Sequence, residues 1–228
     1  MNPKISTHLI FALVLVSIPL SANDPFEVFN RKIWAFNEFL DNNLAKPTAE
    51  IYTSIAPDPV EVAVSNFFRN INELDNTANQ VLQGHPILAI NDFSRFIINS
   101  TIGLAGFLDV ASRLGLERHD EDFGQTLGSW GVPSGPYLMI PIYGPSTPRS
   151  LTGRSVSSVL SGTFAIKEND VRLAITGLDA LETRARYLEV ESLIIGDRYS
   201  FIRDSYMQYQ EFELSNGEDL IDDFVDDM

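Results

Sequence analysis

Residues 124–153 read GQTLGSWGVPSGPYLMIPIYGPSTPRSLTG and divide the chain into two parts. The stretch holds six glycines and five prolines, which interrupt a regular helix and a long central strand alike. Between them lie many apolar residues, among them Trp130, Tyr137 and Tyr143. A solvated linker does not carry that much apolar surface. We therefore expect an irregular segment that other parts of the molecule cover and that serves the function.

Helical patterns occupy the sequence on both sides of this segment. In the first of them, Phe26, Phe29, Ile33, Phe36 and Leu40 recur at steps of three and four, which is typical of an amphipathic helix. Such an apolar face packs more often into a protein core than against lipid, so periodicity alone favours a core position. Further helices are expected at residues 51–55, 58–71, 72–82, 87–102, 107–114, 149–164, 168–187 and 198–212. These patterns predict an all-α fold.

The composition excludes several classes of function. The chain of 228 residues is 44% hydrophobic and carries a net charge of -15, which fits a folded domain with an acidic surface. Such a surface repels the phosphates of nucleic acids, which excludes DNA and RNA as partners. The absence of cysteine excludes a disulfide, a thiolate nucleophile, a Cys-ligated metal and a lipidated cysteine in this chain.

Both ends of the chain differ from the middle in composition. Residues 1–22 have the layout of a secretory signal peptide, with Lys4, an apolar run from Leu9 and small residues at the end. The apolar run is shorter than the roughly 20 residues that a membrane-spanning helix needs. Residues 213–228 are strongly acidic, and we expect a disordered tail there. The helical domain is thus predicted to cover residues 23–212.

The densest polar cluster is the sequence ERHDED at residues 117–122. Because neighbouring residues on a loop point in different directions, we expect a connector or a helix cap there. A hydrolase that uses Asp120 or Asp122 is the least favoured alternative. His85 lies in a tight Gly-His-Pro turn with no ligand partner spaced nearby, which favours a structural role. The sequence predicts no catalytic residue, no metal site and no cofactor, and we expect a protein that is not an enzyme.

Short sequence blocks follow one another in an order that resembles a known family. The opening block is DPFEVFNR at residues 24–31, and the densest blocks are EDFGQTLG, WGV and GPYLMIP between residues 121 and 141. The other blocks are residues 65–70, 82–84, 95–103, 106–111, 144–146, 149, 181–185 and 206. Together they resemble the MlaA/VacJ family of Gram-negative outer-membrane phospholipid-transport proteins over residues 24–212.

The resemblance implies a single-domain, ring-like arrangement of amphipathic helices, with a Gly/Pro-rich hairpin around a central channel. Such proteins lie in the inner, periplasmic leaflet of the outer membrane. They remove mislocalised phospholipid from the outer leaflet, pass it to the soluble periplasmic carrier MlaC and associate with trimeric porins. The implied function is therefore non-enzymatic phospholipid transport that maintains lipid asymmetry.

The same resemblance implies a channel and its gate. The early helix would line or gate the channel, and residues 124–143 would form the hairpin beside it, with glycine and proline setting the turns. Aromatic rings of the hairpin would lie at polar–apolar boundaries, as such rings prefer. The expected channel and gate residues are Phe29, Ile33, Phe36, Trp130, Gly131, Gly135, Pro136, Tyr137 and Tyr143.

Two features depart from the family pattern. Family members usually carry an acylated cysteine after the signal peptide, and residues 19–24 contain none, so we expect a protein that is not an acylated lipoprotein. Ser150 follows Arg149 where the family often has an acidic residue, so no local ion pair is expected there. The missing anchor and the acidic tail leave an alternative open, a periplasmic or peripheral adaptor protein that kept the fold without lipid transfer.

Overall fold

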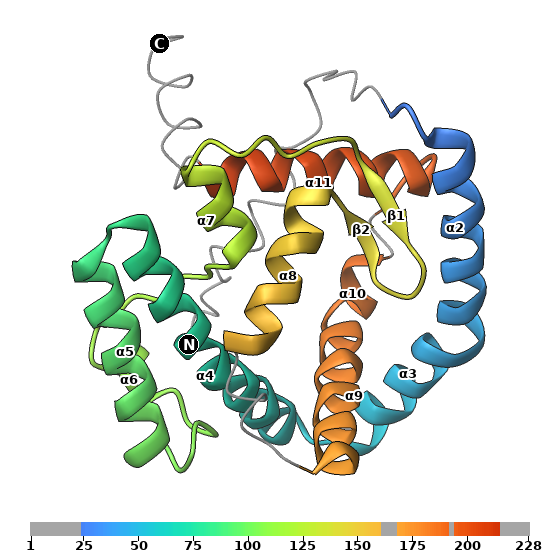
Figure 1. Cartoon of the computed structure of the whole chain (residues 1–228). Helices are drawn as coiled ribbons and strands as arrows, with labels where there is room; N and C mark the ends of the chain where they lie inside the picture. Colours follow the sequence, from blue (N-terminus) through green and yellow to red (C-terminus); the bar gives the residue numbers. More distant parts are fainter. Residues whose placement is uncertain (1–23, 161–167, 192–193, 215–228) are drawn as a thin grey trace, which may run out of the picture.

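The computed structural model describes residues 24–160, 168–191 and 194–214 (Figure 1). The predicted signal peptide and most of the predicted tail lie outside this part of the chain. The elements in order are α2 (Glu27–Leu40), the π-helical turn η1 (Asp41–Ala45), α3 (Lys46–Ile55), α4 (Asp58–Gln83), α5 (Pro86–Thr101), α6 (Val110–Arg113), α7 (Phe123–Ser129), β1 (Leu138–Ile140), β2 (Gly144–Ser146), α8 (Pro148–Leu160), α9 (Asn169–Arg186), α10 (Leu188–Glu191) and α11 (Arg198–Leu214). The predicted all-α class is confirmed, with one short hairpin as its β-structure among these residues.

The helices are arranged as a frame with elements inside it. Figure 1 shows α11, α2, α3, α4 and α7 following one another around the molecule, while α8, α9, α10 and the β1–β2 hairpin lie within that frame. Helix α5 turns back along α4, and α6 packs beside α5. The predicted ring-like arrangement is therefore present. Within the described ranges, none of the helices is both long and apolar enough to cross a membrane.

Helix α4 is a single helix of 26 residues where the sequence pattern suggested two. The predicted break at Asn72 is wrong, because neither glycine nor proline occurs between Pro59 and Gly84 and nothing interrupts the backbone hydrogen bonds. Pro59 lies in the first turn, where its missing N–H has no helical partner to lose. The length of α4 lets it run along one whole side of the frame.

The Gly/Pro segment is more regular than its composition suggested. It contains α7, which includes Gly124 and Gly128, and its last residues begin α8 at Pro148. The Asp122 carboxylate caps α7 by accepting the Gln125 N–H at 2.8 Å, which offsets the low helix propensity of glycine. The hairpin is confined to residues 138–146, a shorter range than predicted, and its strands pair Leu138 with Ser146.

A small aromatic cluster forms the apolar core where the hairpin meets two helices. Tyr137, Met139 and Tyr199 are buried there, and Ile33, Trp34, Tyr206 and Met207 pack against them. The rings of Tyr137 and Tyr206 meet edge to face at 6.1 Å, a favourable geometry for aromatic pairs. This cluster joins α2, β1 and α11, so it fixes the place of the hairpin. Helix α11 continues to Leu214, two residues past the predicted end of the helical domain at residue 212.

Candidate functional site

On several helices, apolar side chains are exposed and polar side chains are buried. On α5, the Ile87 and Ile90 side chains are 80% and 68% exposed, while Asp92, Arg95 and Asn99 are buried. The periodicity of α5 was predicted correctly, but its apolar face points outward. Isolated exposed hydrophobic residues are normal in soluble proteins, whereas a continuous apolar surface marks a membrane or protein contact.

Helix α2 shows the same inversion. Phe26, Phe29 and Phe36 are all more than 40% exposed, and Asn30 is fully buried. The expected core position is therefore wrong for these three phenylalanines, whereas Ile33 of the same pattern packs against the core. The reason is that a 3.6-residue period identifies an apolar face but does not identify what covers it.

Buried ion pairs hold the α4–α5 hairpin together. The Arg95 Nε donates to the Glu73 Oε1 at 2.8 Å, and both side chains are almost fully buried. Arg95 also donates to the Leu116 carbonyl at 2.6 Å and approaches Asp109 at 3.3 Å. A buried guanidinium is tolerated only when partners of this kind satisfy its donors.

The charged connector at residues 117–122 has the structural role that its contiguity predicted. The Glu121 carboxylate accepts hydrogen bonds from Gln80 and Gln83, at 3.1 and 2.7 Å, and His119 contacts Asp92 at 2.7 Å. The connector therefore ties α7 to α4 and α5. His85 contacts Gln80 at 3.1 Å, as a structural turn residue. No group of three or more metal-ligand residues converges within the described ranges.

Two asparagines of α2 hold the hairpin by its backbone. Asn30 donates to the Tyr137 carbonyl at 3.1 Å and accepts the Met139 N–H at 2.9 Å. Asn37, two turns further along, donates to the Ile140 carbonyl at 2.9 Å and accepts the Ile142 N–H at 2.8 Å. Each side-chain amide thus replaces a strand partner with one donor and one acceptor.

Sequence reasoning missed these two asparagines. Both lie in α2, which was interpreted through its aromatic residues alone. A usable signal was present, because Asn30 is seven residues from Asn37 and the pair falls on one helical face. An amide pair with that spacing has the donors and acceptors that an extended backbone needs.

The structure separates the predicted channel and gate residues into two groups. Ile33 and Tyr137 pack in the aromatic cluster, and Tyr137 is only 2% exposed, so its predicted place at a polar–apolar boundary is wrong. The cause is the pair of hydrogen bonds between Asn30 and the backbone of Tyr137 and Met139, here called the Asn30 clamp, which draws β1 inward. The other seven predicted channel and gate residues are exposed: Phe29, Phe36, Trp130, Gly131, Gly135, Pro136 and Tyr143.

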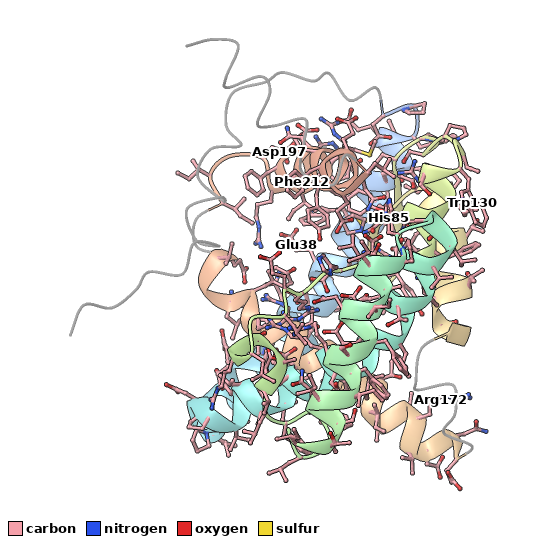
Figure 2. The ribbon with its side chains drawn as sticks, turned by 90° about the vertical axis from the view of Figure 1, so that its left-hand side faces the viewer. Glu38, His85, Trp130, Arg172, Asp197 and Phe212 are labelled. Carbon is pink, nitrogen blue, oxygen red and sulfur yellow. The ribbon has the colours of Figure 1, made fainter. Side chains whose placement is uncertain are left out.

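The exposed group lies around the hairpin and the end of α7. Trp130 donates to the Leu82 carbonyl at 3.2 Å and lies at the edge of the molecule (Figure 2). Gly131 has φ +85° and open space where a side chain would start, whereas a Cβ at Gly135 would lie 3.0 Å from Pro148. Tyr143, in the hairpin turn, is 71% exposed.

Charged residues inside the frame connect helices that are distant in sequence. Glu191 accepts from Arg184 at 2.8 Å, from Arg198 at 2.9 Å and from Lys46 at 3.3 Å. Burial would raise the pKa of Glu191, but these three cations lower it to about 2. Arg184 also binds Asp41 at 2.6 Å. Polar groups therefore stabilise the interior contacts between α3, α9 and α11.

Arg149 and Ser150 form hydrogen bonds to separate partners. The Arg149 guanidinium donates to the Val132 carbonyl at 3.2 Å, and it forms no salt bridge with another described residue. The Ser150 hydroxyl instead contacts the Tyr206 hydroxyl at 2.7 Å. A hydroxyl contact thus joins α8 to α11 at this position.

A helical frame with many exposed apolar side chains and several buried, ion-paired polar ones defines a class of protein whose surface suits an apolar environment. The chain belongs to the MlaA lipoprotein family, whose profile matches residues 22–213.

Relatives and a solved structure agree with this assignment. The chain is 34% identical to the Haemophilus influenzae "Intermembrane phospholipid transport system lipoprotein MlaA", over 86% of this chain and 80% of the relative. The Escherichia coli protein of the same description is 33% identical, with the same coverage. A chain of a solved structure, described as "Structural basis for maintenance of bacterial outer membrane lipid asymmetry", is 32% identical with a TM-score of 0.75. The match covers 84% of this chain and 98% of that chain.

Proposed function

We propose that this protein transports phospholipid without catalysing a reaction. It removes mislocalised phospholipid from the outer leaflet of the outer membrane and hands it to a periplasmic carrier. The family relatives described as phospholipid-transport proteins support this proposal. The observation that carries it is the inverted surface, because the exposed apolar side chains of α2, α4 and α5 need a lipid environment and the polar interior can accommodate lipid headgroups.

The apolar surface also supports membrane retention without an acyl chain. Transfer of exposed apolar side chains from water to lipid contributes about 25 cal/mol per Å² of buried surface. One acyl chain by itself gives only marginal membrane binding, so its loss is tolerable. The proposed location is the periplasmic leaflet of the outer membrane, after removal of residues 1–22. The proposed partners are phospholipid, the carrier MlaC and a trimeric porin.

The exposed predicted residues around the hairpin are proposed as the channel and gate. The group comprises Phe29 and Phe36 on α2, Trp130 and Gly131 after α7, Gly135 and Pro136 before β1, and Tyr143 in the hairpin turn. Ile33 and Tyr137, in the aromatic cluster, support this group of residues. Because the Asn30 and Asn37 clamps join α2 to β1, movement at one segment is transmitted to the other.

Complementation of a deletion strain tests the gate. Phe36→Asp and Gly131→Pro are expected to raise surface-exposed phospholipid above the wild-type level. The Gly131 change removes a backbone donor to Gly128 at 2.8 Å and conflicts with the positive φ. Asn42→Asp, at an exposed polar position just after the same helix, is the control and should complement. Equal behaviour of Phe36→Asp and Asn42→Asp would refute the gate assignment.

Fractionation separates this proposal from the adaptor alternative. We expect a transport protein to be found in the outer-membrane fraction and to resist release by osmotic shock. Release with the soluble periplasmic proteins, together with unchanged lipid asymmetry in the deletion strain, would favour an adaptor.

A further inference from the structure

A cavity of ≈ 560 Å³ lies where α3, α4, α9 and α10 meet. Its volume falls within the range of small-molecule sites, about 300–1,000 Å³. Figure 1 shows α3, α4 and α9 adjoining one another on the side of the frame opposite α11, with α10 following α9 inside the frame. None of the predicted channel residues lines it. The residues that carry its charge and polarity are Tyr52, Asp58, Glu61, Ser65, Arg69, Glu182 and Arg186.

The charges on the cavity wall are not mutually neutralised. Glu182 pairs with Arg186 at 3.0 Å. The side chains of Asp58, Glu61 and Arg69 form no salt bridge or hydrogen bond with any described residue. The carboxylates of Asp58 and Glu61 and the guanidinium of Arg69 are therefore available to a ligand that carries both a positive and a negative charge.

Charges of both signs surround Arg69. Partial burial lowers the pKa of Arg69, the charges of Arg118 and Arg186 lower it further, and those of Asp120 and Glu182 raise it. The two neighbouring cations pair with these carboxylates, Arg118 with Asp120 and Arg186 with Glu182. Arg69 itself has no such partner among the described residues, so an anion there would gain charge-assisted hydrogen bonds.

Two residues that carry a hydroxyl group, Tyr52 and Ser65, also line the cavity. The Tyr52 Oη is buried and has no hydrogen-bond partner within the described part of the chain. Burial raises the pKa of Tyr52, and the charges of Glu61 and Glu182 raise it further, which places this hydroxyl near both carboxylates. Ser65 lies on α4 between Glu61 and Arg69 and is also buried.

Glu61, Ser65 and Arg69 recur at steps of four along α4, so all three lie on one face of the helix. Glu61 and Arg69 are eight residues apart, or about 12 Å along the helix axis, and both have long side chains. Exposed Val62 lines the same cavity, so apolar surface adjoins the charged residues.

We propose that this cavity binds the phosphoethanolamine headgroup of a phospholipid, with Arg69 on the phosphate and Glu61 on the ammonium. The inference rests on the proposed transport function and names its substrate class. An ammonium group has hydrogen-bond donors for the carboxylates, which a choline group lacks. A purely anionic headgroup would face two uncompensated carboxylates, so it fits less well.

Lipid binding by the full chain in detergent micelles tests the site. The probes are phosphatidylethanolamine, phosphatidylcholine, phosphatidylglycerol and soluble phosphoethanolamine. Native mass spectrometry measures how much of each probe the protein binds. Wild type is expected to prefer phosphatidylethanolamine. Arg69→Gln should weaken binding of this lipid about 10-fold, the effect of one charge-assisted interaction. Glu61→Gln should abolish the preference over phosphatidylglycerol. Arg172→Gln, on the exposed start of α9 (Figure 2), is the control and should bind as wild type.

Each outcome decides a different claim. Unchanged phosphatidylethanolamine binding in folded Arg69→Gln and Glu61→Gln would overturn the site, as would a wild-type preference for phosphatidylglycerol or phosphatidylcholine. Binding of soluble phosphoethanolamine without binding of the lipid would overturn the headgroup assignment. If the lipid site fails while the deletion strain still loses asymmetry, the transport function stands. If wild type binds no phospholipid and asymmetry is unaffected, the proposed function itself fails.

Discussion

Asn37 accepts a hydrogen bond from the Ile142 N–H at 2.8 Å, which connects α2 to a hairpin turn 105 residues further along the chain. Ile142 has φ +71°, an uncommon conformation for a β-branched residue. The Asn37 amide therefore stabilises a turn that is costly by itself. Together with Asn30 it makes α2 and the hairpin one mechanical unit.

Removing the clamp is expected to loosen the hairpin selectively. Asn37→Ala deletes two hydrogen bonds, worth about 1–2 kcal/mol together. Hydrogen exchange of residues 138–146 should accelerate about 10-fold, without loss of the helices. Asn43→Ala, which removes a bond to the Phe39 carbonyl at 2.7 Å, is the control and should leave the hairpin unchanged. Equal exchange in both variants would show that Asn37 does not hold the turn.

Arg95 is expected to be essential for stability. Arg95→Met leaves the Glu73 charge buried without its partner and should lower the free energy of unfolding by about 3–5 kcal/mol. The double variant Arg95→Met, Glu73→Leu removes both charges and should recover most of this loss. Urea unfolding in detergent, followed by circular dichroism, measures both. The exposed Arg113→Met serves as control, and a comparable loss there would contradict the prediction.

Asp75 is expected to make stability depend on pH. Burial raises the pKa of Asp75 to about 6, even though Ser157 and Asn79 donate hydrogen bonds to it. The folded state therefore holds the proton more tightly than the unfolded state, whose pKa is 3.8. Stability contributed by this proton is complete below about pH 4 and is lost as the pH rises to about 6, a loss of up to about 3 kcal/mol.

Asp75→Asn removes this titration. The free energy of unfolding of Asp75→Asn, relative to that of wild type, should increase between about pH 4 and pH 6 and stay constant at higher pH. Thermal unfolding across this range measures the difference. Asp170→Asn, at the exposed start of α9, is the control. A pH-independent difference for Asp75→Asn would refute the assignment.

A charge on the outward apolar face should weaken membrane association. Ile90 is 68% exposed, so Ile90→Asp removes little packing within the protein. In lipid the carboxylate costs about 2–3 kcal/mol or more. Liposome flotation should therefore show less bound protein for Ile90→Asp than for the control Asn42→Asp, at an exposed polar position. Identical flotation would mean that this face does not contact lipid.

The helical class was predictable because periodicity is a local property. Helix α2 was predicted to run from Phe26 to Leu40 and was found at Glu27–Leu40, since its 3.6-residue pattern is uninterrupted. The direction of the apolar faces was not predictable, because the same pattern suits a core and a bilayer. The buried position of Tyr137 and the half-buried position of Ile33 depend on packing in a cluster with Tyr199, far away in sequence. The Arg69 cavity likewise arises from four separate helices, which no local pattern brings together.

The most direct test of the proposed function is the phospholipid exposed on the cell surface with and without this gene. Chemical labelling of surface amines on intact cells would be compared between wild type, the deletion strain and the complemented strain. The account predicts more exposed phospholipid on deletion, restored by the wild-type chain located in the outer-membrane fraction. Unchanged exposure on deletion would contradict the transport of phospholipid by this protein.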